Sequence, residues 1–227
     1  MVGIIIQLII SFLLIWLYER GGLRVLGLAP TKKRARDFVV YFLIAAFCSS
    51  SEFFMRMIFA EQRWQFNPDL SFRLILDGIW WNIKSVLFEE LIFRGAIFYI
   101  LIKKLGTTKA ILVSAAAFGI YHWFSHEAFG NPGQMLITFV VTGAAGLVYA
   151  YGYAKTFSLY IPIAMHLGWN FVKSVVFSET IIGDQLLVHV KPVPEIQVSY
   201  FIFFCMLLLP IGSFYLINYL LLKNRKR

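Results

Sequence analysis

The chain has 227 residues, of which 59% are hydrophobic and only 15% are charged, and its formal net charge is +9. This composition is too apolar for a soluble globular domain and indicates a protein that crosses a membrane several times. The positive charge does not indicate nucleic acid as a partner, because the basic residues fall in short segments between apolar runs.

Seven apolar runs approach or exceed the length of about 20 residues that a helix needs to cross a bilayer. They are Val2–Tyr18, Phe38–Ala60, Arg73–Ile102, Ala110–Phe124, Gln134–Tyr153, Leu159–Ser178 and Val198–Leu222. The sequence therefore predicts an all-α bundle of about seven transmembrane helices, forming a single membrane domain over residues 1–227. The third run would measure roughly 45 Å as a helix. We expect it to tilt, to bend or to begin as an interfacial helix around Asp77 and Gly78.

The distribution of Lys and Arg predicts the orientation, because cytoplasmic loops are enriched in these residues. The proposed cytoplasmic segments carry Arg20, Arg24, Lys32, Lys33, Arg34, Arg36, Lys103, Lys104, Lys109, Lys155, Lys223, Arg225, Lys226 and Arg227. The opposite side holds little beyond Arg63, Arg73 and Lys191. We therefore expect the N-terminus outside, the C-terminus in the cytoplasm, and the first run retained as a span.

Two connecting segments differ in character from the spans. Residues 19–37 form a basic segment with Gly and Pro, which we interpret as a cytoplasmic linker in contact with water or lipid headgroups. Residues 179–197 contain Pro192 and Pro194 and form either a loop or a short lid. Cys48 and Cys205 lie in apolar runs, so they indicate neither a disulfide framework nor a metal motif.

Three charged residues interrupt the third run: Glu89, Glu90 and Arg94. One charge at the centre of a bilayer costs roughly 2.5–3.5 kcal/mol on insertion scales, so such a cluster is a candidate functional site. On a helix Glu90 and Arg94, four residues apart, share a face, whereas Glu89 is turned about 100° away. Glu89 is therefore the candidate general base. The alternative is a purely structural lock between helices, and we expect such a lock for Glu52 and Arg56.

Other spans supply polar residues at comparable depth. His122 follows Phe118 by four residues in the fourth run, and His166 and Asn170 are four apart in the sixth. Counted from the cytoplasmic ends, Glu89, His122 and His166 lie roughly 20, 18 and 11 Å deep. A carboxylate, two imidazoles and a carboxamide are suited to activating water and stabilising an oxyanion. A lone intramembrane histidine is more often a helix contact.

His126 follows His122 by four residues, a spacing that also suits two metal ligands. The turn residues Gly130, Asn131, Pro132 and Gly133 follow at once. We therefore interpret His126 as a loop residue near the surface that assists the site at most indirectly.

Three motifs occur in order on separate predicted spans, and together they resemble the CPBP family of CAAX proteases and bacteriocin-processing enzymes. The motifs are E-E-x-x-x-R at Glu89, Glu90 and Arg94, F-x-x-x-H at Phe118 and His122, and H-x-x-x-N at His166 and Asn170. The resemblance covers roughly residues 73–178, the expected catalytic core. A Leu26-Gly27-Leu28 segment is similar to one in many bacterial members. The resemblance therefore implies a multi-pass protein of a bacterial or archaeal cell membrane.

The resemblance implies a glutamate-dependent intramembrane endopeptidase. In it, Glu89 and His122 would activate the attacking water, and His166 and Asn170 would stabilise the oxyanion. The remaining motif residues would support the site: Glu90, Arg94 and Phe118.

The family resemblance leaves a metal cofactor as an alternative. Glu89, His122 and His166 would hold a divalent ion such as zinc. We favour a metal-free site because the chain lacks the H-E-x-x-H pair of other membrane metalloproteases.

Two functions of other classes compete with proteolysis. An ion- or proton-coupled transporter would also contain intramembrane Glu and His, but it predicts repeats or paired broken helices, which we do not find. A non-catalytic scaffold on the protease fold would not need the polar residues of all three motifs. The expected partners are the lipid bilayer and a membrane-associated peptide. Whether that peptide carries a prenylated C-terminus, a leader or a sorting signal stays open.

Overall fold

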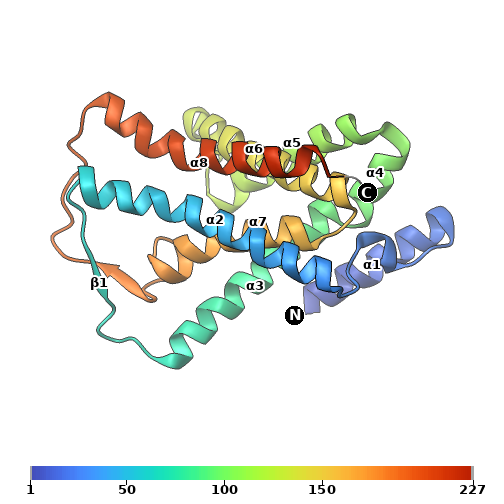
Figure 1. The fold of residues 1–227 in the computed structure, drawn as a ribbon, viewed down its shortest axis with the longest axis horizontal. Coiled ribbons are helices and arrows are strands. Elements are labelled where there is room, and N and C mark those ends of the chain that lie inside the picture. Colours follow the sequence, from blue (N-terminus) through green and yellow to red (C-terminus); the bar gives the residue numbers. More distant parts are fainter. Residues whose placement is uncertain (1, 226–227) are drawn as a thin grey trace. The chain divides into compact units, whose positions relative to one another are not determined.

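The computed structural model describes residues 2–225, so Lys226 and Arg227 of the predicted basic C-terminus lie outside the described residues. Helices dominate the described chain (Figure 1). In chain order the elements are α1 (Val2–Glu19), a 3-10 turn (Leu23–Leu26), α2 (Lys32–Phe59), β1 (Trp64–Phe66), α3 (Phe72–Arg94), α4 (Ala96–Leu105), α5 (Thr107–Ser125), α6 (Pro132–Thr156), α7 (Tyr160–Phe171), a π-helical turn (Val172–Val176), β2 (Leu187–His189) and α8 (Tyr200–Lys223).

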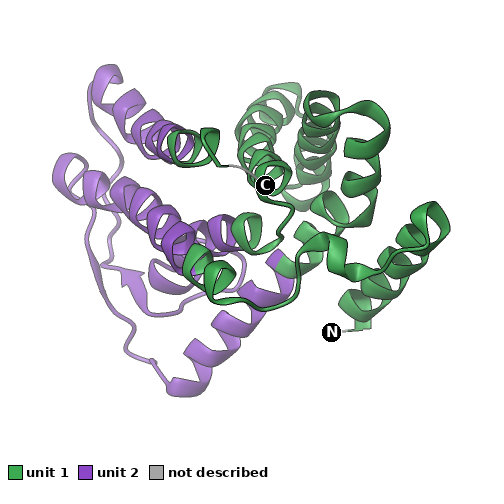
Figure 2. Cartoon of the chain, turned by 45° about the vertical axis from the view of Figure 1, so that its right-hand side comes forward, with its two compact units in different colours: residues 1–38, 87–163, 218–227 green, residues 39–86, 164–217 purple. Residues whose placement is uncertain are grey.

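The chain divides into two compact units, coloured separately in Figure 2. The first unit comprises residues 1–38, 87–163 and 218–227, and the second comprises residues 39–86 and 164–217.

The first unit is a helical bundle in which α5 packs along α6 and also against α4, while α1 packs against α4. Its apolar core includes the fully buried side chains of Phe98, Tyr153 and Leu159. Most side chains of α1 that lie outside this core are exposed and apolar, which suits a helix surrounded by lipid.

The second unit contains a short element that the apolar runs did not predict. Strands β1 and β2 pair antiparallel, with Trp64 opposite His189. Behind the strands, the rings of Phe53 and Phe177 stack with centroids 3.9 Å apart. The expected all-α architecture therefore holds except for these two three-residue strands, and the segment 179–197 is partly a strand rather than only a loop or lid.

Four helices of the described residues are long and apolar enough to cross a membrane: α1, α2, α6 and α8. Charged side chains along α3 reduce its hydropathy, and α7 has only 12 residues. The chain is thus helical with several candidate spans, and the count of seven and the orientation stay predictions.

The long third run is divided between two helices, but the break between them does not lie where the sequence indicated. Around Asp77 and Gly78 helix α3 is continuous, and the break falls at Gly95, between α3 and α4. A Cβ atom at Gly95 would overlap the carbonyl oxygen of Leu91. Glycine therefore permits the change of direction directly after the charged motif.

Helix α2 begins six residues earlier than predicted and includes part of the expected linker. Thr31 precedes its first residue, and the Thr31 Oγ1 atom accepts a hydrogen bond of 3.2 Å from the backbone N–H of Arg34. This contact caps the first turn. Apolar runs cannot reveal such a start, because its first residues are charged.

Candidate active site

Glu90 and Arg94 form a fully buried ion pair at the end of α3. Arg94 Nη1 lies 3.1 Å from Glu90 Oε1, and both side chains have 0% exposure. Their spacing of four residues places them on one helix face, as the sequence indicated. A buried charge needs such a partner, because an uncompensated one costs several kcal/mol.

Three further groups enclose the Arg94 guanidinium. Its Nη2 atom donates a 3.1 Å hydrogen bond to the carbonyl oxygen of Gly146 in α6. The guanidinium carbon lies 4.3 Å from the ring centroid of Phe118 and 5.3 Å from that of Tyr149. Arg94 thus connects α3 to α5 and α6 through charge, hydrogen bonding and aromatic faces.

The structure brings Glu89 and His122 together within the first unit. Glu89 Oε2 lies 3.9 Å from His122 Nε2, and the two side chains are 13% and 11% exposed. This separation is too long for a direct hydrogen bond. One water molecule can bridge groups at this distance.

The other ring nitrogen of His122 lies 2.8 Å from the carbonyl oxygen of Phe118. Because a carbonyl only accepts hydrogen bonds, this contact assigns the proton to Nδ1. In the neutral ring Nε2 then carries a lone pair, and it is the atom nearest to Glu89.

The surroundings of His122 are mostly aromatic. Its ring centroid lies 4.4 Å from Phe118 and 5.5 Å from His126. His126 is exposed and forms the C-terminal cap of α5, as expected of a residue near the surface.

Ser114 Oγ, one turn before Phe118, donates a 2.8 Å hydrogen bond to the carbonyl of Phe93. This bond ties α5 to the end of α3.

His166 and Asn170 belong to the second unit and lie one turn apart on α7. His166 is buried at 4% exposure, and Asn170 is half-buried. The helix backbone near them is held by serines. Ser49 Oγ donates to the carbonyl of Trp169 at 3.1 Å, and Ser174 Oγ donates to that of Asn170 at 2.6 Å.

Sequence reasoning missed the contribution of Gly146, Tyr149 and Ser114. A weak signal exists in the small residues from Gly143 to Gly146, which are typical of helices whose backbones approach closely. Ser114 and Tyr149 carry no spacing that separates them from other packing residues.

Comparison with known proteins yields one family. Residues 70–172 match the family model described as Type II CAAX prenyl endopeptidase Rce1-like. The matched segment contains every residue of the three motifs, from Glu89 to Asn170. No curated protein and no solved structure matches the chain.

Proposed function

We propose that the protein is an intramembrane endopeptidase that cleaves a membrane-associated peptide, because residues 70–172 match the model of the Rce1-like type II CAAX prenyl endopeptidases, a family of membrane proteases. The observation that carries the proposal is the approach of Glu89 Oε2 to His122 Nε2 at 3.9 Å. Both atoms accept hydrogen bonds when the carboxylate is ionised and the imidazole is neutral. A water between them would therefore donate one proton to each.

Such a water presents its lone pairs away from both acceptors, toward a substrate carbonyl carbon. Glu89 takes the proton as the oxygen attacks, and His122 holds the water in place through Nε2. The proton on Glu89 then passes to the nitrogen of the leaving amine as the C–N bond breaks. The products are a carboxylic acid and an amine, so atoms and protons balance.

The negative oxygen of the tetrahedral intermediate needs hydrogen-bond donors. We assign this role to His166 and Asn170 on the basis of the family motif. Losing one oxyanion donor typically costs about 10²–10³ in rate.

Glu90 and Arg94 act in this proposal as a brace rather than as reacting groups. Their mutual ion pair and the bond from Arg94 to Gly146 fix the end of α3. Since Glu89 precedes Glu90 directly, a fixed helix end also fixes the base.

A metal-dependent variant is the alternative, with Glu89, His122 and His166 as its ligands. Catalytic zinc sites use three protein ligands. Among the described residues no three His, Cys, Asp or Glu side chains form a group that could hold a metal ion. Glu89 and His122 belong to the first unit and His166 to the second, so this three-ligand centre stays an alternative, and the steps above need no metal. We expect cleavage to persist after exhaustive chelation, with metal analysis of the same sample as the check.

Glu89→Gln tests the proposal, because the amide keeps the size of the side chain but cannot accept the proton. We expect a loss of about 10²–10⁴ in rate. The assay uses purified full-length protein in liposomes with two probes, a peptide with a farnesylated C-terminal cysteine motif and the same peptide without the lipid. The preferred probe also shows whether the substrate is prenylated.

Asp77→Asn is the matched control. It removes a carboxylate from the same helix at a side chain that is 71% exposed, and we expect the wild-type rate. Cleavage by Glu89→Gln at the rate of Asp77→Asn would refute the assignment of Glu89 as the base.

A further inference from the structure

The second unit contains a ring of four charged side chains that the mechanism above does not use. Glu52 and Arg56 lie on α2, Lys173 lies on the π-helical turn, and Glu179 follows that turn. Arg56 Nη2 lies 2.7 Å from Glu52, and Arg56 Nη1 lies 2.8 Å from both carboxylate oxygens of Glu179. Lys173 Nζ lies 2.9 Å from the other oxygen of Glu52. We call these four residues the charged ring.

The ring closes through the backbone. The N–H of Glu179 donates a 2.8 Å hydrogen bond to the carbonyl of Lys173. Lys173 is therefore held at both ends, by Glu52 at its ammonium and by Glu179 at its carbonyl. Two carboxylates balance two cations, and the side chains are only 16–31% exposed. Partly buried and balanced pairs couple more strongly than exposed ones, whose net contribution is small.

Helix α7 contacts one face of α2, and this face ends at the charged ring. Phe42, Ala45, Ser49, Glu52 and Arg56 recur every three or four residues and so share one face of α2. A Cβ atom at Gly168 would overlap the carbonyl of Phe42 and lie 3.1 Å from the Ala45 side chain, and Ser49 bonds to the carbonyl of Trp169. Asn170 thus lies between a close backbone contact on one side and the charged ring on the other.

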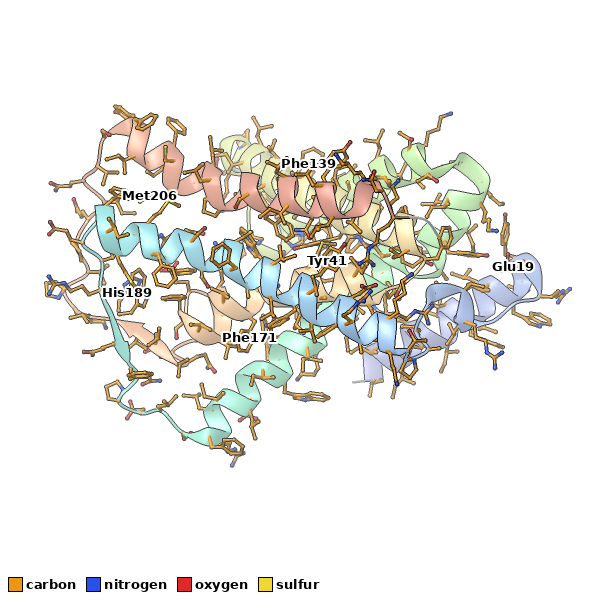
Figure 3. The ribbon with its side chains drawn as sticks, viewed as in Figure 1. Glu19, Tyr41, Phe139, Phe171, His189 and Met206 are labelled. Carbon is orange, nitrogen blue, oxygen red and sulfur yellow. The ribbon has the colours of Figure 1, made fainter. Side chains whose placement is uncertain are left out.

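The strand pair contacts the charged ring through His189. His189 Nε2 on β2, a residue labelled in Figure 3, lies 3.0 Å from Glu179 Oε1. Since a carboxylate only accepts, Nε2 carries a proton here. The His189 ring also lies 4.4 Å from Trp64 on β1, which packs against Phe53 and Phe177. The carboxylate of Glu179 is therefore held in place by Arg56 and by His189.

We propose that the charged ring is a positioning element for Asn170 and His166, with Lys173 and Glu52 as its decisive pair. The inference rests on the proposed function, in which these two residues stabilise the oxyanion. Lys173 follows Asn170 by three residues, so a shift of its turn moves the carboxamide. A misplacement of about 1 Å can cost a hundredfold in rate, even when its origin is remote.

The test compares Lys173→Met, Glu52→Gln and the double variant in the cleavage assay. Each single change leaves one excess charge in the ring, so we expect kcat to fall about tenfold with KM within about twofold of wild type. The double variant removes both charges and restores balance, so its loss should be smaller than the product of the single losses. Lys173→Arg keeps the charge and should retain most of the activity, and Asp77→Asn is the control outside the ring.

A second measurement does not depend on activity. Hydrogen–deuterium exchange of residues 166–176 in Lys173→Met should rise above wild type, while exchange in α5 and α6 stays unchanged. If Lys173→Met lowers only the unfolding temperature, with kcat and exchange at residues 166–176 unaltered, the positioning role is overturned. If the wild-type protein cleaves neither probe peptide, the proposed function fails, and the exchange result alone still decides whether the ring holds the end of α7.

Discussion

The hydrogen bond from His122 Nδ1 to the carbonyl of Phe118 determines what the other ring nitrogen can do. With a proton at Nδ1, Nε2 of the neutral ring is an acceptor and faces a second acceptor, Glu89 Oε2, at 3.9 Å. A group placed between these two acceptors must donate a hydrogen bond to each of them. In the proposed mechanism this donor is the attacking water.

His122→Ala tests this role at the level of one residue. The variant loses the acceptor that orients the water, so we expect a fall of about 10²–10⁴ in kcat. Because the His122 side chain is only 11% exposed, its truncation also costs stability, so kcat is measured on folded protein quantified by its thermal unfolding transition.

His126→Ala is the matched control for His122→Ala. His126 is exposed one turn further along α5, and its removal should leave kcat near the wild-type value. Equal losses in both variants would contradict the assignment of His122.

At the scale of elements, contacts among α3, α5 and α6 hold the residues of the first two motifs near one another. Ser114 and Phe118 on α5 contact the end of α3, and Gly146 on α6 accepts a hydrogen bond from Arg94. The sequence predicts these helices from their apolar runs and predicts the Glu90–Arg94 pair from its spacing. It does not predict the break at Gly95, because the relevant contact is with the carbonyl of Leu91 and not with a pattern of side chains.

Gly146→Ala tests the packing of α6 on this junction. The added methyl group would lie 3.1 Å from Arg94 Nη2 and 3.2 Å from Phe118 Cβ. These neighbours are themselves held in place, so we expect a destabilisation of about 1–3 kcal/mol. Chemical unfolding in detergent measures it, and the cleavage rate should fall with it as Arg94 moves.

Gly143→Ala, one turn earlier on α6, provides the comparison. The nearest atom to its added methyl group would be the carbonyl oxygen of Ala115 at 3.6 Å, an ordinary contact. Alanine exceeds glycine in helix propensity by up to about 1 kcal/mol, so this variant should be neutral or stabilising. A similar destabilisation in both variants would mean that α6 tolerates no methyl group on this face and that Arg94 is not the reason.

At the scale of the whole molecule, local patterns and distant contacts differ in what the sequence can reveal. The spacing of four residues between Glu52 and Arg56 predicted their ion pair, which the structure contains at 2.7 Å. The extension of that pair to Glu179, 123 residues away, has no local signature. The same holds for the strand pair, whose three-residue strands lie far apart in the chain. The motif residues were found because each motif is contained within one helix.

The predicted topology is the remaining property of the whole chain, and single cysteines can test it. In a Cys205→Ser background, where the buried Cys48 should stay unreactive, Arg63→Cys and Lys109→Cys place thiols on exposed residues before α3 and after α4. If α3 with α4 makes one crossing, a membrane-impermeant maleimide should label Arg63→Cys in intact cells and Lys109→Cys only after permeabilisation.

Lys191→Cys is the internal control, because the N–H of Val190 donates to the carbonyl of Arg63 at 2.9 Å and both segments must share a side. Labelling of Arg63→Cys and Lys109→Cys from the same side would require an even number of crossings between them. The predicted seven-span arrangement would then be wrong at the helix that carries Glu89.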